Sequence, residues 1–194
     1  MERALDIDEH KLWNRLRTAG WIAAAIILLL PAIAMQFTQE VAWTPSDFVF
    51  AAVLLGGTGI VFELVLRKSG SSAYRLGALF ALTSAFLMIW ISGAVGIIGN
   101  EGNPANLMYV GVLGTAVFGT LAARFRPGAL SIAMVATALM QTVVTVIAMI
   151  GTRGTPADDP LKLLVLNGFF IALWLLAAAL FRKAAGKKSA TGQV

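Results

Sequence analysis

The sequence lacks cysteine and contains a single histidine, His10. The absence of cysteine excludes disulfides, thiolate catalysis and cysteine metal sites. One histidine cannot form a bis-histidine haem site or a zinc centre of the usual kinds. His10 also precedes the first apolar segment, whereas Ser84 and Ser92 lie in the third, which argues against a Ser-His-Asp set. We therefore expect no metal, no cofactor and no enzymatic activity.

Charged residues are scarce as well, at 13% of the chain against 58% hydrophobic residues. A typical globular protein has about 25% charged residues. Crossing a hydrocarbon core of about 30 Å takes roughly 20 residues of helix, and the chain offers six apolar stretches of about that length. They are 19–37, 46–66, 74–98, 107–123, 129–150 and 161–181. The sequence predicts an all-α membrane domain over 19–182, preceded by a segment 1–18 and followed by a basic tail, 183–194.

Lys and Arg alternate between crowded and nearly empty segments, which is the pattern of the positive-inside rule. One set of 13 cations lies before the first stretch, in the second and fourth connections and in the tail. The other set contains only Arg153 and Lys162, both in the fifth connection. This asymmetry predicts that both termini are cytoplasmic and that the basic clusters face anionic lipid rather than nucleic acid.

The N-terminal region allows two interpretations. Residues 4–17 resemble a short amphipathic helix that would lie on the inner membrane interface. Alternatively, Ala32-Ile33-Ala34 after an apolar run resembles a signal-peptidase site. The acidic residues before the apolar run, Glu2, Asp6, Asp8 and Glu9, favour the first interpretation.

Three of the expected helices begin with a capping residue followed by proline: Thr44-Pro45, Asn103-Pro104 and Asp159-Pro160. A side-chain oxygen can accept from an orphan N–H there, and proline at the first helical position loses no needed hydrogen bond. The chain thus divides into three similar helical hairpins. Duplication would explain them, but the need of any membrane helix for a cap and a basic anchor explains them more simply.

Small residues predict where helices pack closely in the bilayer. The fourth stretch has Gly111, Thr115, Gly119 and Ala123 at intervals of four. The third has a stripe of Gly77, Ala81, Ser84, Ser92, Gly96 and Gly99, and the second has Gly56, Gly57 and Gly59. We expect the second, third and fourth helices to pack most tightly.

Polar residues within the apolar stretches are candidates for function, because such groups are costly in lipid. Glu63 is the main ionisable one, and Arg67 four residues later could pair with it. Gln141 lies near the middle of the fifth stretch with Thr137 and Thr145 on its face, and Asn167 lies in the sixth. These five residues, Glu63, Thr137, Gln141, Thr145 and Asn167, form a candidate polar path or, alternatively, separate interhelical contacts.

A second candidate site gathers acidic and amide side chains in the expected outer connections: Glu40, Asp47, Asn100, Glu101, Asn103 and Asn106. Oxygen ligands of this type suit a hard cation, although no connection has the spacing of a defined calcium motif. Asn103-Pro104-Ala105 also matches the tripeptide of aquaporins. Only one copy is present and no apolar segment remains for re-entrant half-helices, so helix capping explains the tripeptide better.

The stretch from Trp43 to Arg126 contains the motifs WTPSDF, FELV, AYR and AVGIIGNEGNPANLMY. This stretch resembles a group of bacterial six-span membrane proteins with no assigned activity. The resemblance implies a bacterial inner membrane and nothing about a substrate.

Two functions remain. The first is a non-enzymatic component of the lipid bilayer that serves as a partner subunit. Its partner would be a second copy of the chain, in a homo-oligomer, or another membrane protein. The second is a small channel or transporter for a small solute or cation, lined by the candidate polar path.

Overall fold

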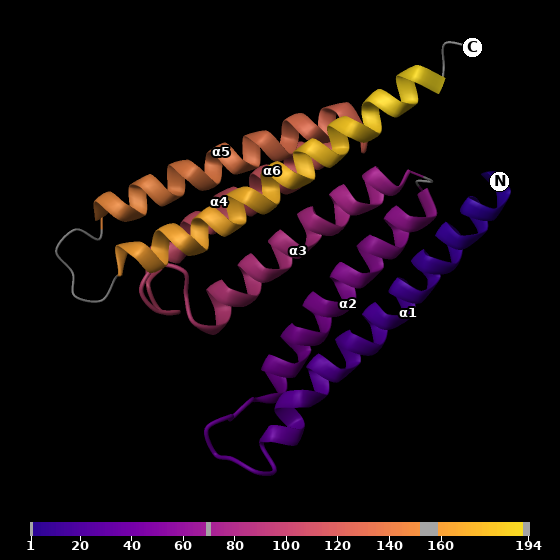
Figure 1. The fold of residues 1–194 in the computed structure, drawn as a ribbon. Helices are drawn as coiled ribbons and strands as arrows, with labels where there is room; N and C mark the ends of the chain where they lie inside the picture. Colours follow the sequence, from indigo (N-terminus) through magenta and orange to yellow (C-terminus); the bar gives the residue numbers. More distant parts are fainter. Residues whose placement is uncertain (1, 69–70, 152–158, 192–194) are drawn as a thin grey trace. The chain divides into compact units, whose positions relative to one another are not determined.

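The computed structural model describes residues 2–68, 71–151 and 159–191, and the regular secondary structure of this part is helical, without strands (Figure 1). Six α-helices and one short 3-10 helix follow one another. They are α1 (Glu2–Ala34), α2 (Pro45–Lys68), α3 (Ser72–Ala94), η1 (Pro104–Leu107), α4 (Met108–Ala122), α5 (Pro127–Gly151) and α6 (Pro160–Thr191).

Each α-helix contains a span long and apolar enough to cross a membrane, in the case of α4 together with η1. The spans are Leu12–Ala34, Pro45–Arg67, Ser72–Ala94, Pro104–Ala122, Pro127–Gly151 and Pro160–Gly186. At a rise of 1.5 Å per residue, the shortest, with 19 residues, reaches about 28 Å. The prediction of an all-α, six-span membrane protein is confirmed.

The three proline starts are also confirmed, because α2, η1 and α6 begin at Pro45, Pro104 and Pro160. Asn103 Oδ1 accepts from Ala105 N at 2.9 Å, and Asp159 Oδ1 accepts from Leu161 N at 2.9 Å. Thr44 differs from the expected cap. Its hydroxyl donates to Asp47 Oδ2 at 2.7 Å, and the same carboxylate oxygen accepts from the Thr44 backbone N–H at 2.7 Å.

The chain divides into two compact units, one ending at Leu64 and the other beginning at Val65. The first unit consists of α1 and most of α2. Helix α1 continues without interruption from Glu2 through the span that starts at Leu12. Residues 4–17 therefore belong to α1 and do not form a separate helix.

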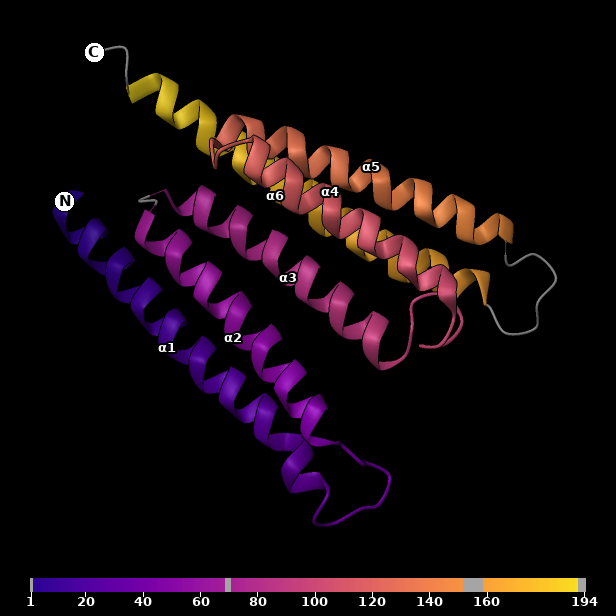
Figure 2. The same ribbon diagram turned by 180° about the vertical axis from the view of Figure 1, so that it is seen from behind.

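The second unit is built from α3 to α6. Helix α6 packs against both α5 and α3, and α4 packs against α5. Figures 1 and 2 show α6 in front of α4 from one side and behind it from the other. Helices α3 and α4 are neighbours in sequence but barely touch. The expectation that the second, third and fourth helices pack most tightly is wrong for α3 and α4: the tight seams of this unit are α5 with α6, α3 with α6, and α4 with α5.

Close packing in the second unit uses the predicted glycines, with partners that the sequence did not identify. A Cβ on Gly77 would lie 3.2 Å from Phe181 Cδ1 and 3.3 Å from the Ala177 carbonyl oxygen, both on α6. A Cβ on Gly119 would lie 2.9 Å from Ala133 Cβ on α5. Gly96 and Gly99 lie beyond the end of α3, with φ of 75° and 68°, so they form a turn and do not extend the α3 stripe.

Candidate functional site

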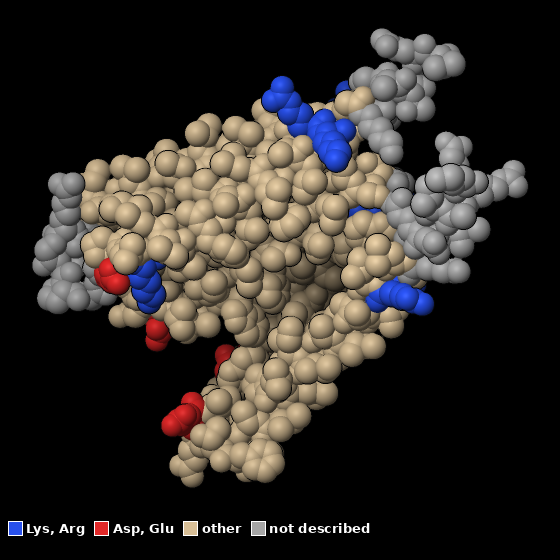
Figure 3. Space-filling model, viewed as in Figure 1, with Lys and Arg blue, Asp and Glu red and all other residues tan. Residues whose placement is uncertain are grey.

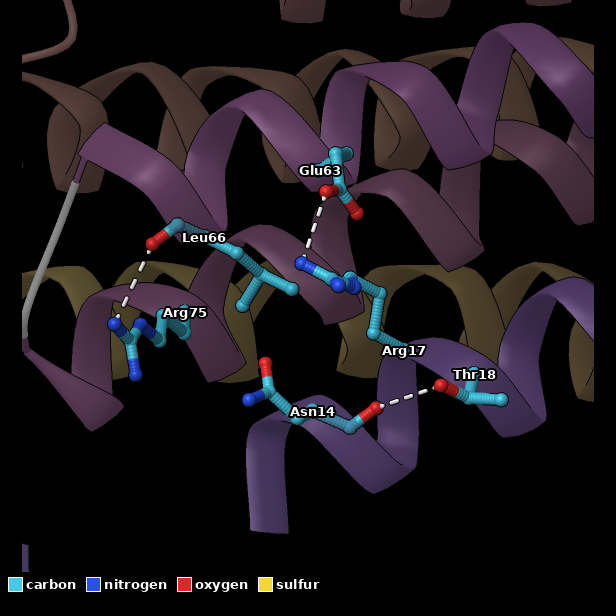
Figure 4. A network of polar contacts seen from close by, with 6 residues as sticks. All are labelled: Asn14, Arg17, Thr18, Glu63, Leu66 and Arg75. Atoms are coloured by element: carbon cyan, nitrogen blue, oxygen red, sulfur yellow. Dashed lines mark hydrogen bonds and ion pairs between the residues drawn. The ribbon is translucent and has the colours of Figure 1, made fainter. Parts of the chain in front are cut away.

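Two of the contacts between α1 and α2 in the first unit lie one helical turn apart. Arg17 Nη1 donates to Glu63 Oε1 at 3.1 Å, an ion pair between side chains that are 43% and 17% exposed (Figure 4). One turn further along both helices, the ring of Trp21 covers Gly59, where a Cβ would lie 2.9 Å from Trp21 Cη2. The contacts are spaced by four residues on each helix, so they lie on a single face of α1 and of α2.

Glu63 therefore has a partner that sequence spacing did not indicate. Arg67 was the expected partner because it lies four residues later, whereas Arg17 precedes Glu63 by 46 residues. A carboxylate within an apolar span is stabilised when a guanidinium neutralises it. In the structure this ion pair connects the two helices of the hairpin.

The interior of the second unit contains a three-residue polar network from three different helices. Tyr109 on α4 donates its hydroxyl to Asn167 Oδ1 on α6 at 3.0 Å. Gln141 on α5 donates from Nε2 to the same Asn167 oxygen at 2.6 Å. Asn167 Nδ2 donates to the Leu163 carbonyl of its own helix at 2.9 Å. Tyr109 is 1% exposed, and Gln141 and Asn167 are fully buried.

The hydrogen bonds fix the orientation of both amides. Asn167 must present Oδ1 to Tyr109 and Gln141, because Nδ2 is needed at the Leu163 carbonyl. Gln141 must then present Nε2, since its oxygen would otherwise face the Asn167 oxygen. Gln141 Oε1 is left buried without a hydrogen-bond partner among the described residues. A buried acceptor in this condition costs about 1–3 kcal/mol.

Hydroxyl groups continue the polar interior of α5. Thr137 donates to the Ala133 carbonyl at 2.9 Å, and Thr145 donates to the Gln141 carbonyl at 2.7 Å. Both side chains are buried, so the polar face predicted for α5 points into the unit. Their hydrogens are used within α5 and do not link it to another helix.

Three further buried polar atoms of the second unit have no hydrogen-bond partner in the described part of the chain: Ser84 Oγ and Ser92 Oγ on α3, and Trp174 Nε1 on α6. Ser84 is fully buried and Trp174 is 1% exposed. The sequence predicts close packing for Ser84 and indicates no special role for Trp174 or Tyr109. For Ser84 and Trp174, the only feature of the sequence that indicates a place on the buried face is helical spacing. Ser84 lies seven residues after Gly77, and Trp174 lies seven residues after Asn167.

The candidate polar path is thus divided by the structure. Gln141 and Asn167 are in direct contact, and Thr137 and Thr145 lie on the same buried face of α5. Glu63 belongs to the first unit and pairs there with Arg17.

The candidate cation cluster is largely engaged in local structure. Asn106 Oδ1 accepts from the backbone N–H groups of Ile97 and Ile98 at 3.0 and 2.9 Å, and its Nδ2 donates to the carbonyls of Ile98 and Asn100 at 3.2 and 2.8 Å. Asn103 and Asp47 serve the helix starts described above. Glu40, Asn100 and Glu101 are exposed. The described residues contain no group of three or more His, Cys, Asp or Glu side chains that could hold a metal ion.

The connection from Val95 to Asn103 is a tightly folded cap on the second unit. Ile97 and Ile98 are 4% and 1% exposed and join the main hydrophobic cluster. Gly96 permits this turn through its positive φ, and a Cβ there would lie 2.3 Å from Asn100 C. Asn106 then holds the folded connection through its four hydrogen bonds.

At the opposite end of the second unit, adjacent residues of α3 connect it to two other segments. Tyr74 donates its hydroxyl to the Phe125 carbonyl at 3.1 Å, in the turn between α4 and α5. Arg75 donates from Nη2 to the Leu66 carbonyl at 3.3 Å, in the last turn of α2 (Figure 4). Both side chains are 8% exposed. The turn contains left-handed non-glycine residues, Arg124 and Phe125, which are costly unless the surroundings hold them.

Charge is distributed unevenly along the helices. On the face shown in Figure 3, most Lys and Arg side chains of each unit lie toward one end and the Asp and Glu side chains toward the other. We call the end of the second unit with Arg75, Arg124, Arg126 and Arg182 the basic end, and the end with Glu101 and Asp159 the acidic end. Lys162 is a cation at the acidic end. Arg153, and the side chains of His10, Lys187 and Lys188, lie outside the described residues.

Comparison of the chain with protein-family models, curated proteins and solved structures finds no match.

Proposed function

We propose that the protein is a non-enzymatic component of a bacterial inner membrane, with both termini cytoplasmic, which acts as a partner subunit through its α1–α2 unit. A contrast between α2 and the glycine-packed seams of the second unit carries the proposal. In those seams Gly77, Gly111 and Gly119 face side chains of neighbouring helices. Gly20 on α1 and Gly56 and Gly57 on α2 would meet nothing within 4 Å if a Cβ were added, and Gly151, Gly168 and Gly186 outside the seams are open as well.

Burial supports the same contrast. None of the most apolar 18-residue window of α1 is buried, and only 6% of that of α2, against 44% for α5. Lipid covers apolar helix faces at no cost, but glycines allow a second helix to approach its backbone closely. A membrane helix of another subunit is therefore the occupant that suits the face of α2 around Gly56 and Gly57.

Photo-crosslinking in native membranes tests this role. A photoreactive amino acid would replace Val53 or Ile60, which lie on either side of Gly56 and Gly57 and are 68% and 56% exposed. We expect a discrete protein adduct, either a second copy or another protein, that disappears when Gly57→Ile is added. Phe118 and Ile132, each 73% exposed, are the control positions in the second unit. Lipid adducts alone from all four positions would contradict the proposal.

A second candidate is a small channel or transporter for a small solute or cation. The observation that favours it is Gln141 Oε1, a buried acceptor without a partner among the described residues. Solute and ion flux into liposomes would compare the unaltered protein with Gln141→Leu and Glu63→Gln. Flux that falls with either substitution would favour transport, and absent flux would favour the subunit role.

A further inference from the structure

The interior of the second unit contains hydrogen-bonding capacity that its own residues do not use. Gln141 Oε1 requires a donor, and Trp174 Nε1 requires an acceptor. Ser84 Oγ can supply either, and it too has no partner within the described residues. The three side chains come from α5, α6 and α3, and each is at least 99% buried.

Ser84 and Trp174 lie at the same level of the unit. The antiparallel helices α3 and α6 meet at Gly77 and Phe181, where a Cβ on Gly77 would be 3.2 Å from the Phe181 ring. Ser84 is seven residues after Gly77, and Trp174 is seven residues before Phe181. Seven residues are about two helical turns, so both side chains return to the shared face at matching distances from this contact.

Gln141 lies closer to the acidic end along the same face of α6. It contacts Asn167, and Trp174 is seven residues beyond Asn167 on that helix. The long side chain of a helical residue leans toward the N-terminus of its helix, so Trp174 leans toward the level of Asn167. The unpartnered atoms therefore follow one face of α6 over about two turns.

We infer that Ser84, Gln141 and Trp174 line an internal site for small neutral molecules that both donate and accept hydrogen bonds. The molecule donates to Gln141 Oε1 and accepts from Trp174 Nε1, and Ser84 takes either role. Water is the smallest molecule of this class, and small polyols and amides share its chemistry. The surrounding polar groups, Tyr109, Thr137, Thr145 and Asn167, are also uncharged, so the site suits a neutral molecule rather than an ion.

Buried waters in proteins typically make about three hydrogen bonds to groups that would otherwise be unsatisfied. The unused atoms of Ser84, Gln141 and Trp174 provide such bonds inside a membrane domain. The inference does not depend on the subunit role, because the site lies within one unit and the proposed partner surface lies on the other.

The test uses the indole N–H of Trp174 as a reporter. The full chain in phosphatidylcholine nanodiscs would carry ¹⁵N-labelled tryptophan, and Trp174→Phe would assign one of the five indole signals. We expect magnetisation transfer from water to the Trp174 indole although that residue is 1% exposed. Urea and glycerol would then be titrated. A saturable shift of the Trp174 signal identifies an amide or polyol guest, and water transfer without a shift identifies water.

Two substitutions test whether the named residues hold the guest. Ser84→Ala and Gln141→Leu should each reduce the transfer by at least about twofold, because each removes a hydrogen-bonding group from the site. Thr142→Val is the matched control, since Thr142 is exposed and its hydroxyl donates to the Ala138 carbonyl at 2.9 Å. If Gln141→Leu fails to fold, Ser84→Ala still provides the test, because it leaves the hydrogen bonds among Tyr109, Gln141 and Asn167 intact. A Trp174 indole without water transfer or solute shift, or transfer unchanged in both variants, would overturn the inference.

Discussion

Gly119 on α4 and Ala133 on α5 approach each other so closely that a Cβ at position 119 would lie 2.9 Å from the Ala133 methyl carbon. The neighbouring atom is the Cβ of an alanine, which cannot rotate away. A side chain at position 119 would therefore force the two helices apart. Gly119 therefore determines how closely α4 and α5 pack.

Gly119→Ala should destabilise the protein by about 1–3 kcal/mol, the usual cost of overpacking a tight contact. The measurement is reversible unfolding in mixed micelles. Gly114→Ala on the same helix is the matched control, because its Cβ would meet only Phe118, at 4.0 Å. That control should be neutral or stabilising by up to about 1 kcal/mol, since alanine is the better helix former. Equal effects of the two substitutions would refute the role of Gly119.

Asn106→Ala should open the connection between α3 and η1. The substitution removes an acceptor from two backbone N–H groups and a donor from two carbonyls. We expect a loss of about 2–4 kcal/mol of stability, given the cost of leaving several buried groups unpaired. Hydrogen exchange of residues 95–103, followed by mass spectrometry, should accelerate. Asn100→Ala should change exchange little, because Asn100 contributes its backbone carbonyl to this arrangement.

The cysteine-free chain allows membrane topology to be measured directly. Single-cysteine variants Glu40→Cys and Glu101→Cys should react with an impermeant maleimide from the periplasmic side of intact spheroplasts. Lys183→Cys should react only after the membrane is permeabilised. This result follows from the excess of cations on one set of connections. Reaction of Glu40→Cys and Lys183→Cys from the same side would require an even number of crossings between them and would refute the assigned orientation.

Glu63→Arg combined with Arg17→Glu should restore much of what either single substitution loses. Each single change places two like charges opposite each other on α1 and α2, whereas the double change restores an ion pair. Because Arg17 is 43% exposed, solvent screening limits the coupling to about 1 kcal/mol. Distances between spin labels on α1 and α2 would report separation of the hairpin. Arg15→Glu, also exposed on α1, should not be rescued by Glu63→Arg.

Much of the fold could be predicted from the sequence because lipid imposes simple constraints. A span must be apolar and long enough, and its start must satisfy free N–H groups, so the six helices and the three proline starts were predictable. The continuity of α1 was not predictable from the sequence. The charged residues before Leu12 favour an aqueous or interfacial location, but they do not indicate whether the helix breaks. Local patterns do not report continuity.

The candidate site was harder to predict because it depends on which helices meet. Gln141 and Asn167 stand out as amides within apolar spans, but the sequence did not pair them. Tyr109 completes their network from α4, and a tyrosine at the start of a helix resembles an ordinary interfacial aromatic residue. Small-residue stripes correctly marked buried faces of α3 and α4. They could not identify α6 and α5 as the partners, since a glycine face fits any closely packed helix.

The amide and hydroxyl interior of the second unit has an electrical consequence. Arg75 lies at the basic end. The other buried polar side chains that the structure describes in this unit are dipoles without formal charge: Ser84, Tyr109, Ser131, Thr137, Gln141, Thr145 and Asn167. A transmembrane voltage performs work on a charge that moves through it, at about 2.3 kcal/mol per elementary charge for 100 mV. Rearrangements of this interior move no such charge, so a transmembrane voltage should change its conformational equilibrium only through the much weaker coupling to dipoles.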